Sequence, residues 1–358
     1  MAYTTIDNPE LFFQTKTYTG TGSSHAITLD GSENMQPDWV WIKNRQQTLN
    51  FMMWDSVRGT TKYFYSNLTE AEGTSSSVLT SFDSDGFTVG NNNNVNQSSN
   101  NIVAWNWKAG GSASSNSNGS ITSSVSANTT AGFSIVSYTG TGSNATVGHG
   151  LGSVPKMMIH KDRDNSSYQW GVYHHSLGNQ KNLNLNSTAA ANNDSGGVYY
   201  NSTTPTSSVY SLGTNIGYNK ASDTYISYIF SEVKGFSKFG SYTGNGNADG
   251  TFVYTGFKPA FLIIKRSSAT EDWGLIDNKR DPNNDGSSSQ LFPNGSNVED
   301  TSNDRADFLS NGFKVRVTSP QWNGSGSTYI YMAFAESPFV NSNGVPTNAR
   351  WLCSYLLT

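Results

Sequence analysis

The sequence predicts an all-β protein made of three tandem antiparallel β-sandwich domains of the jelly-roll type. Three observations favour this fold. One set of motifs occurs three times along the 358 residues. Short runs rich in Val, Ile, Thr and aromatic residues alternate with clusters of Gly, Asn, Ser and Asp, as strands alternate with turns. No stretch of 11 or more residues has the apolar period of a helix.

Three landmarks define each repeat and recur in the same order. The first is a Tyr-Thr-Gly motif, the second is an apolar run that follows a proline, and the third is a closing run rich in aromatic residues. They begin at Tyr18, Pro37 and Val103, then at Tyr138, Pro155 and Ile226, and then at Tyr242, Pro259 and Ile330. Between the second and third repeats every landmark shifts by 104 residues, as from 138 to 242. A unit of that length has the size of a whole domain.

The apolar runs indicate where the strands are buried. Residues 39–42 and 261–264 are apolar at every position rather than at alternate ones. Such a strand is covered on both faces, as in the middle of a sandwich or at a contact between domains. Asp85-Gly86 and Asn311-Gly312 are dipeptides typical of tight hairpin turns.

The landmarks divide the chain into six segments. An N-terminal arm covers 1–16, a C-terminal arm covers 339–358, and the sandwich repeats cover 17–109, 132–235 and 236–338. The tract between the first two repeats, 110–131, has the Gly/Ser/Asn composition of a linker, and its Ile121 and Val125 offer apolar contacts to a neighbour. The apolar residues of the arms dock either on a partner subunit or back on the parent domain, and the sequence leaves both alternatives open.

Composition excludes several classes of protein. Only 13% of residues are charged, against about 25% in an average protein, and the net charge is -4, so we expect no nucleic-acid partner. Aromatic residues make up 13%, which argues against disorder. No apolar run approaches the roughly 20 residues of a membrane span, and the first residues lack the pattern of a secretory signal. The single cysteine, Cys353, excludes a disulfide framework.

The titratable residues do not form a recognisable catalytic set. His174-His175 stands where the other repeats have Asp55 and Asp277, and a repeated catalytic site would not exchange His for Asp. We therefore interpret the histidines as a polar loop or strand-edge pair. A glycosidase needs two carboxylates about 5–10 Å apart. Only Glu232 and Glu336 recur at one place, and no ladder of acidic residues follows a strand, so the sequence predicts that the protein is not an enzyme.

One run resembles a calcium loop. Residues 281–286 match the first six positions of the pattern D-x-N-x-D-G, which would make Asp281, Asn283 and Asp285 the ligands. The twelfth position is Phe292 instead of glutamate, and no flanking helices are expected. The alternatives are a calcium site and an ordinary polar turn, and no other cofactor is predicted.

Aromatic side chains are the candidates for glycan binding. Trp170 and Trp273 lie at equivalent positions, 15 and 14 residues after the shared proline, and Phe51 lies at the same place in the first repeat. A ring that recurs in every repeat is either a core residue or a surface on which a sugar stacks. Tyr199 and Tyr200 belong to a loop that only the second repeat has, and loops on a sandwich carry recognition.

Several long motifs occur together in this chain. They cover 36–45, 54–59, 81–87, 103–108, 132–136, 149–152 and 238–246. This combination resembles the tandem concanavalin-like repeat proteins of tailed bacteriophages, which are common among marine phages and include tail-fibre and virion structural proteins. The resemblance extends over roughly residues 1–350. It implies a concanavalin-like sandwich fold and a structural role in a phage particle, and it supplies no catalytic residue.

We therefore expect a bacteriophage virion protein that is made in the host cytoplasm. It would form a surface appendage, either a tail fibre or a capsid fibre or decoration, and contact other virion proteins and host-surface glycans. A homo-oligomer is expected, and a trimer is favoured because fibres are commonly trimeric, although no heptad or collagen repeat imposes one. The alternatives are a glycan-degrading enzyme, such as a depolymerase or glycosidase, and a free lectin-like protein.

Overall fold

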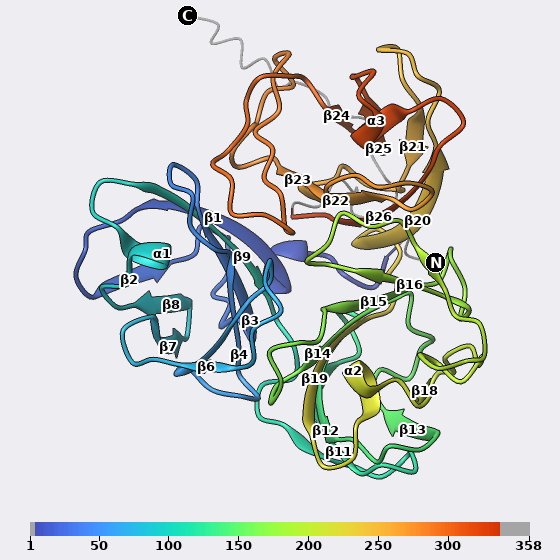
Figure 1. Ribbon diagram of the computed structural model, residues 1–358. Coiled ribbons are helices and arrows are strands. Elements are labelled where there is room, and N and C mark those ends of the chain that lie inside the picture. The colour runs from blue at the N-terminus through green and yellow to red at the C-terminus, as the bar shows by residue number, and fades with distance from the viewer. Residues whose placement is uncertain (1–3, 337–358) are drawn as a thin grey trace, which may run out of the picture.

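The computed structural model describes residues 4–336 of the chain (Figure 1). Strands dominate this part, and its helices are single turns. They are η1 (Pro9–Leu11), α1 (Asn93–Asn96), α2 (Ile216–Asn219) and α3 (Pro320–Asn323). None of the described helices is long and apolar enough to cross a bilayer. The predicted all-β class is confirmed, and the strands named below for residues 4–336 pair antiparallel, as β1 does with β9, β12 with β19 and β20 with β26.

The strands form a large and a small sheet in each third of the chain. In the first third the large sheet has the order β1 (Phe13–Thr19), β9 (Asn101–Trp107), β3 (Trp39–Asn44), β4 (Met52–Asp55), β5 (Lys62–Tyr65) and β6 (Gly73–Thr74). The small sheet has the order β2 (His25–Thr28), β8 (Gly86–Val89) and β7 (Leu79–Asp83).

The other two thirds follow the same plan with different edges. The large sheet of the second third has the order β10 (Ser114–Asn116), β11 (Ser123–Asn128), β12 (Phe133–Thr139), β19 (Thr224–Phe230), β14 (Met157–Asp162), β15 (Gly171–His174), β16 (Lys181–Asn184) and β17 (Asn192–Asn193), and its small sheet pairs β13 (Ala145–Gly148) with β18 (Val209–Leu212). The large sheet of the last third has the order β20 (Ser237–Thr243), β26 (Thr328–Phe334), β22 (Phe261–Arg266) and β23 (Gly274–Asp277). Its small sheet has the order β21 (Phe252–Tyr254), β25 (Gly312–Val315) and β24 (Ala306–Leu309).

In each third the two sheets enclose an apolar core. The first core contains Val40 and Trp54 of the large sheet and Phe87 of the small one. Corresponding cores lie in the second and third repeats. Each repeat is thus a two-layered unit, because burial of one sheet face against another removes the apolar side chains from water.

The Tyr-Thr-Gly landmark lies at the end of β1, β12 and β20 and ties that strand to the short helix of its unit. The Tyr18 hydroxyl donates to the carbonyl of Val95 at 2.7 Å, and Oδ1 of Asn96 accepts from the backbone N–H of Thr21 at 2.8 Å. The same two bonds recur in the other units, where they join Tyr138 to Tyr218, Asn219 to Thr141, Tyr242 to Trp322 and Asn323 to Asn245. This explains why the motif recurs.

The two predicted hairpins are present, and their glycines have a packing role. Gly86 and Gly312 begin β8 and β25, directly after the turns. A Cβ on Gly86 would lie 2.0 Å from the carbonyl oxygen of Ile27, and one on Gly312 would lie 2.1 Å from that of Val253. Only glycine therefore allows the neighbouring strand to approach this closely.

The predicted linker is part of a sheet. Residues 110–131 contain β10 and β11, and β11 pairs with β12 over five residues, from Ser124–Ser137 to Asn128–Phe133. Ile121 and Val125 are buried in the core of the second unit. The composition is that of a linker, but serine and threonine are tolerated in strands near the edge of a sheet, and the two aliphatic side chains supply the burial that holds the segment in place.

The N-terminal arm folds back on the chain to which it belongs. Strand β1 begins at Phe13, within the segment predicted as an arm, and Ile6 and Phe13 are buried. The ring of Phe12 packs edge-on against Phe236 of the third unit, with centroids 6.1 Å apart. The predicted C-terminal arm, 339–358, lies outside the described residues.

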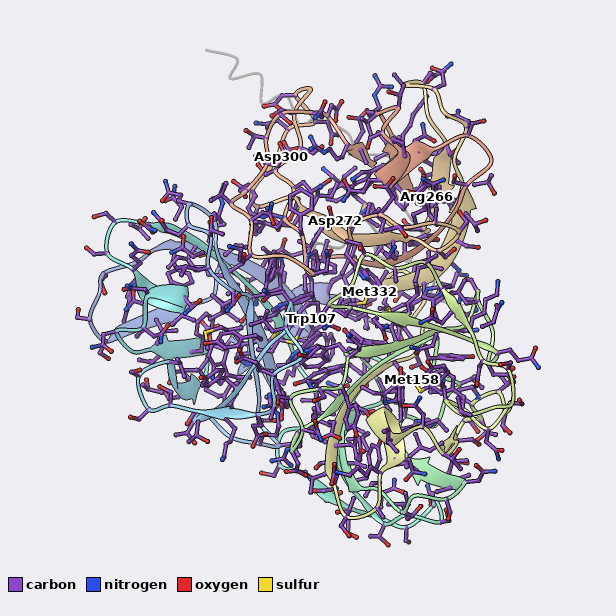
Figure 2. The ribbon with its side chains drawn as sticks, viewed as in Figure 1. Trp107, Met158, Arg266, Asp272, Asp300 and Met332 are labelled. Carbon is purple, nitrogen blue, oxygen red and sulfur yellow. The ribbon has the colours of Figure 1, made fainter. Side chains whose placement is uncertain are left out.

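The three units meet around a shared core (Figure 1). Trp107, Phe230 and Phe334 occupy the same place in the three closing strands, and the ring of Phe334 lies 5.8 Å from Trp107 and 6.0 Å from Phe230. Figure 2 shows Trp107 and Met332 near the centre of the molecule, where the units meet. Trp39 and Trp41 face this shared core, whereas Val40 and Ile42 face the core of their own unit, which confirms the prediction that residues 39–42 are covered on both sides.

Candidate functional site

The predicted glycan-binding tryptophans are buried between units. Trp170 and Trp273 are 0% and 1% exposed. The indole N–H of Trp170 donates to the carbonyl of Tyr65 in the first unit at 3.0 Å, and that of Trp273 donates to Asn184 in the second unit at 3.0 Å. These rings present no face on which a sugar could stack, so of the two interpretations the core is the one that fits their burial.

The predicted tyrosines of the second unit pack within an aromatic cluster. Tyr200 is buried, and its hydroxyl donates to Oδ1 of Asn182 at 3.0 Å. Tyr199 is half-buried and meets Tyr218 edge-on, with ring centroids 5.3 Å apart. Tyr218 also donates to Asn182, so one amide oxygen joins two tyrosines. Tyr200 therefore belongs to the core of the second unit, and its ring presents no exposed face.

The predicted calcium ligands lie on a polar turn. Asp281 is half-buried, whereas Asn283 and Asp285 are exposed. Burial, with Asp285 and Asp304 nearby, raises the pKa of Asp281 to about 6. Residues 4–336 contain no group of three or more acidic or histidine side chains that could hold a metal. The residue that fixes the turn is Asn284, whose side chain accepts from the Phe308 N–H at 2.9 Å and donates to the Phe308 carbonyl at 3.0 Å.

The repeated polar residues instead gather at three seams, where one unit meets the next. At the seam between the first and second units, Asp55 and Arg58 form a buried ion pair of 2.5 Å. The hydroxyl of Tyr228, from the closing strand of the second unit, donates to Asp55 at 2.8 Å. Both charges are therefore satisfied in the interior, which a buried ion pair needs in order not to destabilise the fold.

The seam between the third and first units has the same construction. Asp277 and Arg280 form a buried ion pair of 2.7 Å. The indole N–H of Trp105 donates to Asp277 at 2.9 Å. Trp105 stands at the same position of the closing strand as Tyr228, so an indole and a phenol perform one task at two equivalent places.

The seam between the second and third units replaces the ion pair with neutral groups. His174 and Leu177 stand where the other units have aspartate and arginine, and Met332 stands where they have Tyr228 or Trp105. Nε2 of His174 lies 3.2 Å from the carbonyl of Tyr331. His175 makes the parallel contact, with Nε2 3.0 Å from the carbonyl of Phe239.

A second ion-pair layer crosses two of the seams. Glu72 of the first unit binds Arg163 of the second at 2.9 Å and its own Arg58 at 3.3 Å. Burial opposes the charge on Glu72, but hydrogen bonds from Arg163 and the charge of Arg58 hold its pKa below the ordinary value. Glu299 of the third unit bridges Arg45 and Arg280 in the same way, at 2.6 and 2.8 Å.

One buried lysine from each unit completes the seams. Lys43, Lys161 and Lys265 follow the apolar run at the same position and have 0% exposure. Their ammonium groups donate to carbonyls of the neighbouring unit, at Ser296 (3.2 Å), Thr69 (2.8 Å) and Thr188 (3.1 Å). Burial lowers the pKa of each lysine to about 8. The signal in the sequence is the recurrence of Lys beside a strand covered on both faces.

The seams join the units into a closed ring. The first unit contacts the second, the second contacts the third, and the third returns to the first. Each unit uses two different surfaces, as in a head-to-tail assembly whose rotation closes. One chain thus has the internal arrangement of a cyclic trimer.

The fold and the seams define a class of all-β proteins in which three two-layered units share one core. A family model described as a domain of unknown function, DUF7483, matches residues 8–338. The chain therefore belongs to the DUF7483 family. No protein with curated function matches the sequence.

Proposed function

We propose that this chain is a structural protein on the surface of a tailed bacteriophage particle. In this proposal its three units are jelly-roll sandwiches of the concanavalin-like type, and the appendage is a tail fibre or a capsid fibre or decoration. The motifs of the first repeat, such as residues 36–45, support the phage assignment through their resemblance to tandem-repeat virion proteins.

The observation that carries the proposal is the use of the repeated polar residues. Lysines at one position in all three repeats, and aspartate–arginine pairs in two of them, join units to one another. A repeated enzyme or lectin would be expected to direct such residues at a ligand. In this chain the repeated polar residues hold neighbouring units together instead. This favours a rigid body with a mechanical role, because packed cores transmit strain with little deformation.

Gold-labelled antibody against this chain, applied to purified phage and viewed by electron microscopy, tests the proposal. Label at the tail tip or fibres supports host attachment, and label over the head supports a decoration. Particles from a phage that lacks the gene provide the control. Absence of label from wild-type particles would overturn the virion assignment.

The proposed partners are other virion proteins and host-surface glycans. Because Trp170, Trp273 and Tyr200 are buried, a glycan would be bound by other surface residues. A glycan array probed with the whole chain tests adhesion, and sedimentation of the purified chain tests the proposed trimer.

A further inference from the structure

The three units differ in how they treat one edge of the large sheet. In the second unit, β12 is the strand that leads into the Tyr-Thr-Gly landmark. Its outer edge is covered by β11. The equivalent strands of the other units, β1 and β20, are the outermost strands of their sheets. The same sandwich is therefore seen once with an added strand and twice without it.

The added segment of the second unit closes the gap between the edges of its two sheets. Ile121 pairs in parallel with Val147 of β13, and its N–H donates to the carbonyl of Thr146 at 3.0 Å. The N–H of Thr146 in turn donates to the Ser120 hydroxyl at 2.9 Å. Ile121 and Val125 insert their side chains into the core, so residues 120–126 bind through backbone hydrogen bonds and two aliphatic anchors.

The first unit leaves the corresponding gap open as a groove. A cavity of about 480 Å³ lies between β1 and β2, lined by residues 16–21 and 25–28. Its apolar floor includes Ile27, the counterpart of Val147, and Tyr18, the counterpart of Tyr138. The end of the groove where Val125 packs in the second unit is polar, because Lys16 replaces Val136 there and forms an ion pair with Asp30, the counterpart of Gly150. We call this cavity the β1–β2 groove.

The register shows which backbone groups face the β1–β2 groove. Phe12 accepts from the N–H of Lys108, and Gly20 donates to Asn100, so the even-numbered residues of β1 bond to β9. In an antiparallel ladder the residues between them point their N–H and C=O groups to the other side. The backbone N–H and C=O groups of Thr17 and Thr19 therefore face the groove. Within residues 4–336 no neighbouring strand forms hydrogen bonds with them. By the same alternation Ala26 faces it from β2, as Thr146 does in the second unit.

The third unit has its edge partly closed by side chains. The carbonyl of Phe239 lies 3.0 Å from Nε2 of His175, and that of Thr243 accepts from the Thr251 hydroxyl at 2.8 Å. Ser241 lies between them. In the first unit, within residues 4–336, a side chain approaches this edge only at the start of β1, where the carboxylate of Glu336 interacts with the backbone of Thr15. The β1–β2 groove is thus the site that most resembles the filled one.

We propose that the β1–β2 groove binds an extended strand of a partner protein, which adds to the edge of the large sheet as β11 does in the second unit. The partner segment is rich in Ser and Thr and carries a β-branched aliphatic residue over Ile27, followed four positions later by a polar residue beside Lys16 and Asp30. Main-chain bonds to Thr17, Thr19 and Ala26 supply affinity, and the aliphatic side chain over Ile27 supplies specificity. This inference is independent of the proposed place in a virion.

A peptide copied from the chain provides the probe. Fluorescent Ser-Asn-Gly-Ser-Ile-Thr-Ser-Ser-Thr-Ser-Ala-Asn is the sequence of residues 117–128 with Val125→Thr, which places a polar side chain beside Lys16 and Asp30. It is titrated with the full chain, whose own segment already fills the second unit. Saturable binding by fluorescence anisotropy is expected. The same peptide with Asp in place of its isoleucine should not bind, because a carboxylate over Ile27 would be buried without a partner.

Two variants of the chain locate the binding. Thr17→Pro removes an N–H that faces the groove and leaves the β1–β9 ladder intact, and proline is tolerated on an edge of this kind. It should weaken the peptide by about tenfold, as expected for a lost backbone bond and a blocked register. Ser241→Pro makes the same change at the matched position of the third unit and should leave binding unchanged.

Ala26→Pro is a second, independent change, on β2, and should also weaken binding. It tests the groove separately if Thr17→Pro lowers the unfolding temperature of the chain. Failure of the wild-type chain to bind the peptide would overturn the proposal. Equal binding by the wild type and by both groove variants would also overturn it, and so would equal loss in Ser241→Pro.

Discussion

The indole N–H of Trp105 donates a 2.9 Å hydrogen bond to Asp277, across the seam between the first and third units. The two residues are 172 positions apart in the sequence. Trp107, two residues further along the same strand, is equally buried, but its indole N–H has no partner within the described residues.

This pair of tryptophans allows the seam bond to be measured. Trp105→Phe and Trp107→Phe remove similar volumes from one strand, but only the first also removes a hydrogen bond to a charged group. We expect Trp105→Phe to lower the free energy of unfolding by about 1–3 kcal/mol more than Trp107→Phe. Urea denaturation checks the difference, and equal losses would show that the seam bond contributes nothing.

The buried ion pair at Asp55 makes a larger prediction. Arg58→Met leaves the carboxylate of Asp55 in the interior with only the Tyr228 hydroxyl as a side-chain donor. We expect a loss of about 3–5 kcal/mol in the free energy of unfolding. Arg316→Met, which removes an arginine that is 39% exposed, should change stability by no more than about 0.5 kcal/mol. Comparable effects of the two variants would contradict this account.

The three seam lysines predict a rise in stability at alkaline pH. Burial lowers the pKa of Lys161 to about 8, below that of lysine in the unfolded chain. Between pH 8 and 10 the unfolded state therefore holds a proton that the folded state has lost, and the free energy of unfolding rises with pH. The slope is about 1.4 kcal/mol per pH unit for each lysine.

The lysine effect is measured as the difference in the free energy of unfolding between the wild type and Lys161→Met. Taking the difference cancels the contribution of the tyrosines, which both proteins share. That difference should shift in favour of the wild type from pH 8 to 10. Lys181→Met, at an exposed position of β16, provides the control and should show no such trend. A difference that stays constant with pH would rule out a depressed pKa.

The seam between the second and third units predicts sensitivity to acid. Burial, with a smaller effect of His175, lowers the pKa of His174 to about 3. As the pH falls below about 6.5 the unfolded chain gains a proton that the folded chain does not, so stability is lost progressively down to pH 3.

His174→Gln should reduce this acid loss, since a glutamine does not titrate. Hydrogen exchange at pH 4 should show faster opening of Tyr331 and Phe239, whose carbonyls face the two histidines, than of the seam at Tyr228. Uniform exchange at all seams, or an unchanged acid profile in the variant, would contradict the prediction.

The sequence predicts the all-β class because strands and turns leave local patterns, namely short apolar runs separated by turn residues. The apolar residues at both parities of 39–42 identify a strand buried on both sides, and the structure assigns one side to the unit and the other to the shared core. Composition is a weaker guide for 110–131, where a linker-like sequence forms two strands because Ile121 and Val125 find an unfilled core.

The contacts at the seams could not be predicted from the sequence, because they join residues that lie far apart along the chain. The donors that reach Asp55 and Asp277 from the neighbouring unit are more than 170 positions away, and one is a phenol while the other is an indole. Nothing local distinguishes Trp170 as a residue at a seam from Trp170 as a sugar platform, because only the neighbouring unit decides whether its ring is covered.

The closure of the ring fixes the number of units that this architecture can use. In a solenoid each repeat offers a free end to the next, so the chain can lengthen by one repeat at a time. Here each unit has both of its seam surfaces occupied, and the aromatic rings at the centre fill the space between three closing strands. A duplicated fourth unit would find no vacant surface, and a deleted one would expose the central rings to water. We therefore expect this architecture to tolerate insertions in its loops and at its outer edges, but neither the gain nor the loss of a unit.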